Sequence, residues 1–405
     1  MYLSFAWRYF RAKKSANAIN IISWVTASVI AFATCCQVLV LSVFNGFEGL
    51  VKSLYASFYS DIKILPARGK TFVMTPAEIA RLQKQPGIAS YAMIVEEKAL
   101  LQHNENQSAL YLKGVDSNFS KMSGVPSKVV DGKFDLGTAE SPGLVLGVGI
   151  QNAVAVNIDP SFGSPSLTLI LPKKTDSPDA LEALSEGNAS ATGVFAIQQD
   201  FDNQYALTNI DFVRQQMALG PDDFTAMEVN LSKGKDLDDA QEDLQKTLGA
   251  NFKVLTRFQQ NTSLYQTMQL EKWAIYAVLT LILLIAAFNM VSALTMLVLE
   301  KQMDIRVLQS MGADKNMIQK IFLSEGLLLG VIGAGAGILL AVIICLLQLR
   351  FHFVKLVGGS FLIDYFPVKL IITDFLLVAA TAIGISFIAS WFPAHKAAYQ
   401  PLDLK

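Results

Sequence analysis

The chain has 405 residues, which is enough for two or three domains. Hydrophobic residues make up 52% and charged residues only 17%, against about 25% charged residues in an average soluble domain. This composition excludes a disordered chain, a coiled coil and a purely soluble enzyme. The net charge of −1 argues against a nucleic-acid-binding protein, because such proteins usually carry a basic excess.

Four apolar runs without any charged residue predict four transmembrane helices. They are Ile19–Phe44, Trp273–Leu299, Gly326–Leu349 and Phe375–Ala394. Each run reaches or exceeds the ~20 residues that a helix needs to cross the hydrocarbon layer. The first run is too long for the apolar region of a cleaved signal peptide, so we interpret it as an uncleaved signal anchor.

The basic residues of the short connectors predict the orientation. Residues 1–18 and 300–320 hold four basic residues each, and residues 350–369 hold three. We therefore expect both termini in the cytoplasm and residues 45–272 outside it. Residues 1–18 also predict an amphipathic helix on the membrane surface. The alternative for that segment is an ordinary basic flank with incidental aromatic residues.

These patterns together predict a membrane protein with four transmembrane α-helices and a large α+β extracytoplasmic domain between the first two. The expected segments are 1–18 (cytoplasmic), 19–44 (first span), 45–272 (α+β domain), 273–299 (second span), 300–320 (cytoplasmic helical connector), 321–349 (third span), 350–369 (outer loop), 370–394 (fourth span) and 395–405 (cytoplasmic tail).

The domain is predicted to mix strands and helices. A capping box at Thr75–Glu78, with proline at the first helical position, opens a helix to about Lys84. Apolar residues at helical spacing predict a second helix over Asp236–Leu248. The polar segment Pro172–Ala191 is expected to be a long exposed loop. β-Branched and aromatic residues between turn formers predict strands at Asp61–Leu65, Tyr91–Val95, Ser108–Val115, Gly143–Leu146, Ser166–Leu171, Gly193–Ile197, Ala226–Leu231 and Phe252–Leu255.

We expect no catalytic residue, metal site or bound cofactor in this chain. His103 is the one histidine of the domain and has no catalytic motif around it, so a surface or pairing role is favoured. The acidic clusters Asp200/Asp202 and Asp236/Asp238/Asp239 lack the pattern of a calcium loop and are interpreted as solvated faces. The three cysteines, Cys35, Cys36 and Cys345, lie in apolar runs and favour packing. The sequence holds no P-loop, so ATP-driven work would need an ATPase on a separate chain.

The connector between the second and third spans predicts a rigid helical corner. Residues 300–314 place charged side chains on one side of a helix and Ile305, Leu308 and Met311 near another. Gly312 is a natural end for this helix, and Asp314 is a natural N-cap for the next. Such a corner can pass force to the membrane helices; the alternative is a simple turn at the membrane surface.

The third span carries small residues at a spacing typical of close helix packing. Gly326 and Gly330 form one pair four residues apart, and Gly333 and Gly337 form another. Two carboxylates, Glu325 and Asp374, lie near span ends rather than at mid-bilayer, so no proton relay is expected.

Four stretches give the whole chain a family resemblance. They are Trp7–Lys14, Leu41–Glu48, Glu300–Ala313 and Pro393–Pro401. They resemble motifs of the permease subunits of lipoprotein-releasing ABC transporters (the LolC/LolE type), a branch of the FtsX/MacB-like group. The segment Leu146–Asp159 departs from the family's usual pattern, and Pro172–Ala191 shows no recognisable hook for a carrier.

The resemblance implies a type VII (mechanotransmission) ABC transporter of the bacterial inner membrane. A second permease copy or paralogue would pair with the chain. A separate LolD-like ATPase dimer would bind ATP and Mg²⁺ and drive extraction of lipoproteins from the outer leaflet, for transfer to the outer membrane by way of a periplasmic carrier. Coupling to the ATPase is then expected at Glu300, Lys301, Asp304, Ile305, Leu308, Met311 and Gly312. A lipid groove is expected at Leu41, Phe44, Asn45, Phe47, Trp273, Tyr276 and Ala277; the alternative for these aromatic residues is an interfacial belt.

Two other functions fit the same architecture. A MacB-like efflux permease would export peptides or drugs, although such proteins usually carry a fused ATPase domain. An FtsX-like signalling permease would activate a cell-wall hydrolase and move no substrate. A membrane-bound enzyme is disfavoured because the outer domain has almost no histidine or cysteine.

Overall fold

The computed structural model describes residues 17–83, 85–158, 165–174, 183–356 and 365–399. Most of the amphipathic helix expected over residues 1–18, and the end of the predicted tail, lie outside these residues. The chain forms two compact units. We call residues up to Leu50 and from Gln266 onward the membrane unit, and residues Val51–Tyr265 the domain unit.

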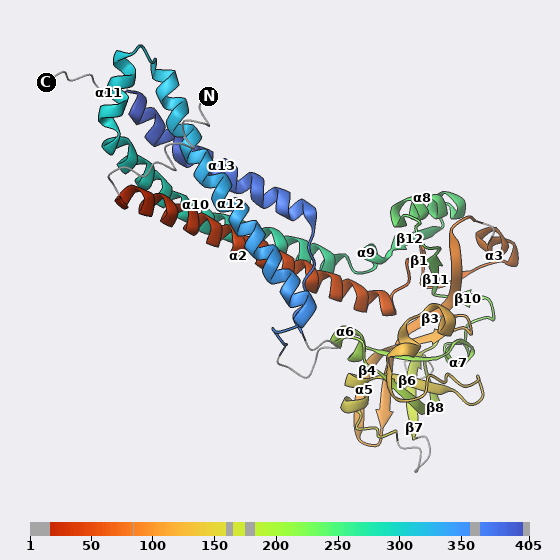
Figure 1. Ribbon diagram of the computed structural model, residues 1–405. Helices are drawn as coiled ribbons and strands as arrows, with labels where there is room; N and C mark the ends of the chain where they lie inside the picture. The colour runs from red at the N-terminus through yellow and green to blue at the C-terminus, as the bar shows by residue number, and fades with distance from the viewer. Residues whose placement is uncertain (1–16, 84, 159–164, 175–182, 357–364, 400–405) are drawn as a thin grey trace. The chain divides into compact units, whose positions relative to one another are not determined.

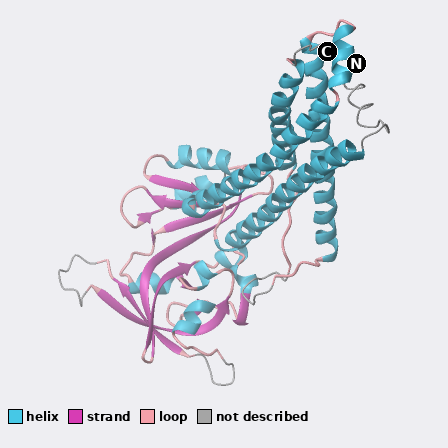
Figure 2. Ribbon diagram, turned by 90° about the vertical axis from the view of Figure 1, so that its left-hand side faces the viewer, coloured by secondary structure: helices cyan, strands magenta, loops and turns pink. Residues whose placement is uncertain are grey.

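Four long helices form the membrane unit, as the sequence predicted. They are α2 (Asn17–Phe58), α10 (Thr262–Glu300), α12 (Lys315–Phe351) and α13 (Ile372–Ala398), and each is long and apolar enough to cross a membrane. They lie side by side in Figures 1 and 2. The short helix α11 (Gln302–Ser310) lies between α10 and α12 along the chain.

Helices α2 and α10 are longer than the apolar runs that predicted them. Helix α2 continues to Phe58, and α10 begins at Thr262. Charged residues end a membrane-spanning run in the sequence, but they do not interrupt the backbone hydrogen bonds of a helix. The boundary between the two units therefore falls inside both helices, at Leu50 and Gln266.

The glycines of α12 lie where neighbouring helices approach closely. A Cβ atom added at Gly326 or Gly330 would lie 2.3 or 2.4 Å from the Cβ of a serine of α13. A Cβ at Gly337 would lie 2.3 Å from the carbonyl oxygen of Ala31 on α2. The first glycine pair thus serves the α13 contact, and the second pair, Gly333 and Gly337, serves the α2 contact.

The domain unit is built on one large sheet with small helices around it. The strands are β1 (Ile62–Pro66), β2 (Phe72–Val73), β3 (Ile88–His103), β4 (Asn106–Val115), β5 (Val129–Gly132), β6 (Gly143–Gly147), β7 (Ser166–Pro172), β8 (Leu184–Phe195), β9 (Tyr205–Asn209), β10 (Asp223–Phe224), β11 (Ala226–Leu231) and β12 (Phe252–Thr256). The helices are α3 (Pro76–Gln83), α4 (Phe119–Met122), α5 (Val148–Ala153), α6 (Gln199–Asp202), α7 (Ile210–Gln216), α8 (Leu237–Leu248) and α9 (Arg257–Gln260), with a 3₁₀ turn at Val125–Lys128.

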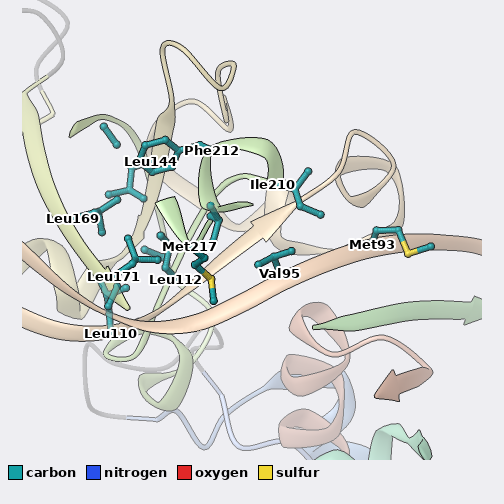
Figure 3. Packing of buried hydrophobic residues seen from close by; sticks show 14 of the residues in the cluster. Met93, Val95, Leu110, Leu112, Leu144, Leu169, Leu171, Ile210, Phe212 and Met217 are labelled. Carbon is teal, nitrogen blue, oxygen red and sulfur yellow. The ribbon is translucent and has the colours of Figure 1, made fainter. Parts of the chain in front are cut away.

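The long strand β3 joins two parts of this sheet. Its first half pairs with β11, which continues to β1 and β12. Its second half belongs to a closed ring in which β3, β4, β9, β6, β8 and β7 pair in turn and β7 returns to β3. Figure 2 shows the strands of the domain unit, several of them strongly curved. Its interior holds apolar side chains, among them Leu110, Leu112, Leu144, Leu169, Leu171, Phe212 and Met217 (Figure 3).

Each of the eight predicted strands overlaps a strand of the structure, but the predicted loop Pro172–Ala191 is partly wrong. Strand β8 begins at Leu184, and its first seven residues, Leu184–Ser190, pair with the whole of β7. Its buried positions there hold Gly187, Ala189 and Ala191. Because these side chains are so small, the alternation gives a weak hydrophobic signal that resembles a loop.

We expect Gly337→Ala to destabilise the membrane unit, because its Cβ would push α2 away from α12. Overpacking of this kind costs about 1–3 kcal/mol. The matched control is Gly335→Ala, since a Cβ at Gly335 has no neighbour within 4 Å. Thermal unfolding of the purified full-length protein should show a lower Tm for Gly337→Ala alone. Equal Tm values for the two variants would contradict the close contact.

Candidate functional site

The corner between α10 and α12 is fixed by its caps. Gly312 ends α11 with a φ of +92°, a value that favours glycine. The N–H of Gly312 donates to Gln309 O at 3.0 Å. Asp314 then accepts from Met317 N–H at 2.8 Å and caps α12. The structure thus has the helix, the glycine stop and the N-cap that the sequence predicted.

Helix α11 has an anchored side and an exposed side. Ile305 is buried against α10, α12 and α13, in a cluster that includes Leu297 and Phe322. The sequence grouped Ile305 with Met311, but Met311 is 78% exposed. Met303 and Val307, at 67% and 55%, share its outward face at spacings of four residues. We call Met303, Val307 and Met311 the exposed stripe. Their four-residue spacing is a sequence signal that could have predicted this outward face.

A small cavity of about 10 Å³ lies beneath α11, with room for about one water. Glu325 lines it and is 4% exposed. The sequence placed Glu325 near the end of its span. The structure buries this carboxylate between α11 and α12, with Lys301 and Asp304 on the same cavity wall.

The residues predicted to form a lipid groove do not lie on one surface. Leu41 and Asn45 are 1% and 2% exposed. Phe47 packs edge-on against Phe366, with ring centroids 5.7 Å apart. Tyr276 is hydrogen-bonded to Thr381 of α13.

The reason is helical periodicity. Successive turns of α2 place Leu41 and Asn45 toward the other helices, whereas Trp273 and Ala277 of α10 face outward. Phe44 lies between these extremes and is half-buried. The seven predicted residues therefore do not line one groove in this structure, because Leu41 and Asn45 are packed inside the helix bundle.

The last turns of α2 form part of the core of the domain unit. Phe58 stacks on Phe201, with ring centroids 4.4 Å apart and an interplanar angle of 21°. The hydroxyl of Tyr55 is hydrogen-bonded to Asp200. Asp202 accepts from Ile197 N–H at 2.9 Å, and burial raises the pKa of its carboxyl group. Asp202 is thus a buried structural residue, which corrects the solvated face that the sequence suggested, whereas Asp200 is exposed.

Four charged side chains lie on the sheet face that α2 covers. The strand register places Lys63 opposite Glu228 and Glu96 opposite Lys113. The ion pairs run diagonally: Lys63 contacts Glu96 at 3.3 Å, and Lys113 contacts Glu228 at 2.7 Å. We call these four residues the charge tetrad. Each pair joins one lysine and one glutamate, so the tetrad carries no net charge.

Aromatic rings shield the inner pair of the tetrad. The Lys113 ammonium lies 4.8 Å from the ring centroid of Phe58 and 4.9 Å from that of Phe119. The side chains of Lys113 and Glu228 are 1% and 0% exposed. Burial acts to raise the pKa of the Glu96 carboxyl group, but the charges of Lys63 and Lys113 outweigh it and lower this pKa. Burial raises the pKa of the nearby Tyr59 to about 12.

Among the residues that the structure describes, no group of three or more His, Cys, Asp or Glu side chains is placed to hold a metal ion. His103 lies with Nδ1 3.0 Å from Val154 O, which agrees with a pairing role. Asp236 caps α8 by accepting from Asp238 N–H at 2.9 Å.

Comparison with known proteins identifies the family. A model described as the MacB-like periplasmic core domain matches residues 23–247, and one described as the FtsX-like permease C-terminal matches residues 276–402. The chain is an ABC transporter permease of the LolC/LolE/MacB/FtsX family.

Curated relatives align with this permease along nearly its whole length. The lipoprotein-releasing system transmembrane protein LolC of Xylella fastidiosa is 25% identical, over 98% of this chain and 96% of its own. LolE of Haemophilus influenzae is 27% identical, over 97% and 96%. LolC of Neisseria meningitidis is 26% identical, over 96% and 95%. The periplasmic region of MacB from Actinobacillus actinomycetemcomitans is 14% identical, over 55% of this chain and 98% of its own, with a TM-score of 0.36.

Family membership establishes the general role and the location of the permease. It is a membrane subunit of a transporter, located in the inner membrane, with its MacB-like domain in the periplasm. The α+β domain between the first two spans is thus the periplasmic part. Permeases of this family imply an ABC ATPase as partner and pairing with a second permease.

We expect Lys113→Met to destabilise the domain unit strongly. It leaves the Glu228 carboxylate buried without its counter-ion, and breaking a buried pair in this way costs about 3–5 kcal/mol. The control is Lys246→Met, because Lys246 and its partner Glu242 are 72% and 73% exposed; such a pair contributes at most about 1 kcal/mol. Thermal unfolding of the full-length permease, followed by circular dichroism, measures both. Similar Tm values would show that the tetrad contributes no more than a surface pair.

Proposed function

We propose that this permease releases lipoproteins from the outer leaflet of the inner membrane for transfer to the outer membrane. The observation that carries the proposal is the end-to-end similarity to LolC and LolE, which are described as transmembrane proteins of lipoprotein-releasing systems. The similarity includes both family segments, so it covers the membrane helices as well as the periplasmic domain.

The energy for release would come from a separate ATPase dimer that carries ATP and Mg²⁺. In this proposal both termini and α11 are cytoplasmic, and the exposed stripe of α11 contacts the ATPase. An apolar stripe flanked by charged residues is well suited to a protein partner. Ile305 on the opposite side fixes α11 to α10, α12 and α13, so that a push on α11 moves these helices.

The periplasmic domain would receive this motion through α2 and α10. The backbone hydrogen bonds of both helices continue from the membrane unit into the domain unit. The last turns of α2 are held in the domain core by Tyr55 and Phe58. A helix that belongs to two units in this way is a suitable mechanical link between them. The substrate would then pass to a periplasmic carrier, with a second copy or a paralogue completing the transporter.

We expect Val307→Asp to weaken binding of the ATPase at least tenfold, because it places a charge at the centre of the exposed stripe. A tenfold loss corresponds to about 1.4 kcal/mol. The control is Gln309→Glu, which adds the same charge on the other side of α11. Co-purification of the co-expressed ATPase with each variant provides the measurement. Retention of the ATPase by Val307→Asp would exclude the exposed stripe as the contact.

Reconstitution tests the proposed activity itself. Proteoliposomes would contain the permease, its co-purifying ATPase and a fluorescent triacylated lipoprotein. Addition of ATP should release the lipoprotein to a soluble carrier, and a non-hydrolysable ATP analogue should not. Steady ATP hydrolysis without release would contradict lipoprotein transport and favour the efflux or signalling function of the wider family.

A further inference from the structure

Three polar side chains from three helices meet at the domain-side end of the membrane unit. Asn45 comes from α2, Lys272 from α10 and Asp374 from α13. The amide of Asn45 donates to Asp374 Oδ2 at 2.6 Å, and its oxygen accepts from Lys272 Nζ at 2.9 Å. Lys272 Nζ also donates to Asp374 Oδ1 and Oδ2 at 3.3 and 3.2 Å. Each pair of the three residues is therefore in direct contact.

The three groups satisfy one another almost completely. Asn45 is 2% exposed, and the side chains of Asp374 and Lys272 are 14% and 27% exposed. The lysine and the aspartate cancel in charge, and the amide serves as donor to one and acceptor to the other. Such a set is stable when closed, because no charge is left without a partner. Its position at the end of the spans lets water hydrate the same groups when they separate.

Two further polar contacts extend this set along α10. Tyr276 is one turn from Lys272 and is hydrogen-bonded to Thr381 of α13. Thr280 is one turn further and accepts from Gln37 Nε2 of α2 at 3.1 Å. The outer half of α10 thus presents a polar residue every fourth position, and each one contacts α2 or α13. We call these three contacts together the polar latch.

Helices α2 and α13 are joined at this end in a different way. The N–H of Lys369, just before α13, donates to Ser42 O of α2 at 3.0 Å. A Cβ atom at Gly46 would lie 2.2 Å from Pro367 O. These are backbone contacts, and they fix the start of α13 on α2. The polar contacts of α10 are made by side chains alone, so α10 is the helix that can separate.

The other half of the α2–α10 contact borders an apolar groove. An apolar cavity of about 360 Å³ lies there, with Asn289 and Ser292 among its residues. Val25 and Val29 of α2 line its opposite wall. An apolar groove thus lies between α2 and α10 at the end far from the domain, whereas polar bonds link α10 to α2 and α13 at the end near it.

We propose that the polar latch is a releasable contact that sets the separation of the domain-side ends of α2 and α10, and that α10 leaves α2 and α13 there during the transport cycle. The role in transport rests on the proposed function. Each hydrogen bond between membrane helices contributes only a small part of the stability of a helix pair. A few such bonds give a closed state that a partner protein can open. Lys272, Asn45 and Asp374 are positioning residues in this proposal.

Distance measurements between spin labels test the latch without any partner. The labels replace Val40 on α2 and Ala277 on α10, in a variant whose three cysteines are changed to alanine. Val40 is 40% exposed, and Ala277 is also exposed, so both accept a label. The unmodified latch should give one narrow, short distance distribution in lipid nanodiscs. Lys272→Met should give a longer and broader one.

A charge swap separates the latch from a general loss of packing. In the variant with both Lys272→Asp and Asp374→Lys, the amide of Asn45 turns over and again meets one donor and one acceptor. We expect this double variant to restore the short distance. Lys369→Met is the matched control, because its side chain is exposed and its backbone N–H is retained. An unchanged distribution for Lys272→Met, or no restoration by the swap, would overturn the proposal.

The release assay then tests the functional role of the latch. Lys272→Met should lower the ATP-driven release rate at least fivefold, and the charge swap should recover most of it. A restored distance without restored release would overturn the transport role of the latch. Failure of the unmodified permease to release lipoprotein would instead count against the proposed function. The distance measurements would still show whether the polar latch sets the separation of α2 and α10.

Discussion

The membrane unit depends on the close approach of α12 to two of its neighbours. Inside a bilayer, apolar helices gain little by leaving lipid for one another, so contact distance and hydrogen bonds decide which helices stay together. The glycines of α12 let its backbone come within van der Waals distance of α13 and α2. The contact of Gly326 with α10 is made instead by the side-chain ends of Met290 and Leu294. Three helices thus form a frame, and the fourth is held by adaptable side chains and by the polar latch.

This division gives the two long helices different roles. Helix α2 belongs to the frame, and its far end is fixed in the domain core, where Phe58 covers the charge tetrad. Helix α10 leads directly into the corner α11, whose outward side is apolar and whose inward side is buried. In the proposed function, movement therefore enters at α11, travels along α10 and is resisted by α2. The polar latch joins the moving helix α10 to the fixed helix α2, so it is the contact on which the two roles act.

The sequence predicted the parts of the fold that depend on strong, local signals. Uncharged runs such as Trp273–Leu299 indicate a membrane span, since few soluble segments of that length lack charge. The capping box at Thr75–Glu78 is present, with Thr75 N–H donating to Glu78 Oε2 at 2.8 Å. Strand β8 was missed over Leu184–Ala191 because it packs through glycine and alanine. The extension of α2 to Phe58 was missed because charge marks the end of a span and not the end of a helix.

The arrangement of the candidate sites could not be predicted in the same way. Asn45 and Asp374 are 329 positions apart, and only the packing of α2 against α13 brings them together. The tetrad needs the strand order β1, β11, β3, β4, which no local pattern specifies. The groove residues were chosen for their apolar character, which does not distinguish a lipid-facing side chain from one inside a helix bundle. The spacing of Met303, Val307 and Met311 puts them on one helix face, but only the buried contacts of Ile305 show that this face points outward.

Depletion of this permease, in a strain without another member of the family, tests lipoprotein release most directly. The measurement is the distribution of mature lipoproteins between separated inner and outer membranes. The proposed function predicts that lipoproteins destined for the outer membrane accumulate in the inner membrane as the permease is lost. If they reach the outer membrane at the normal level in its absence, the permease does not release them, and its ATP-driven motion serves export or signalling instead.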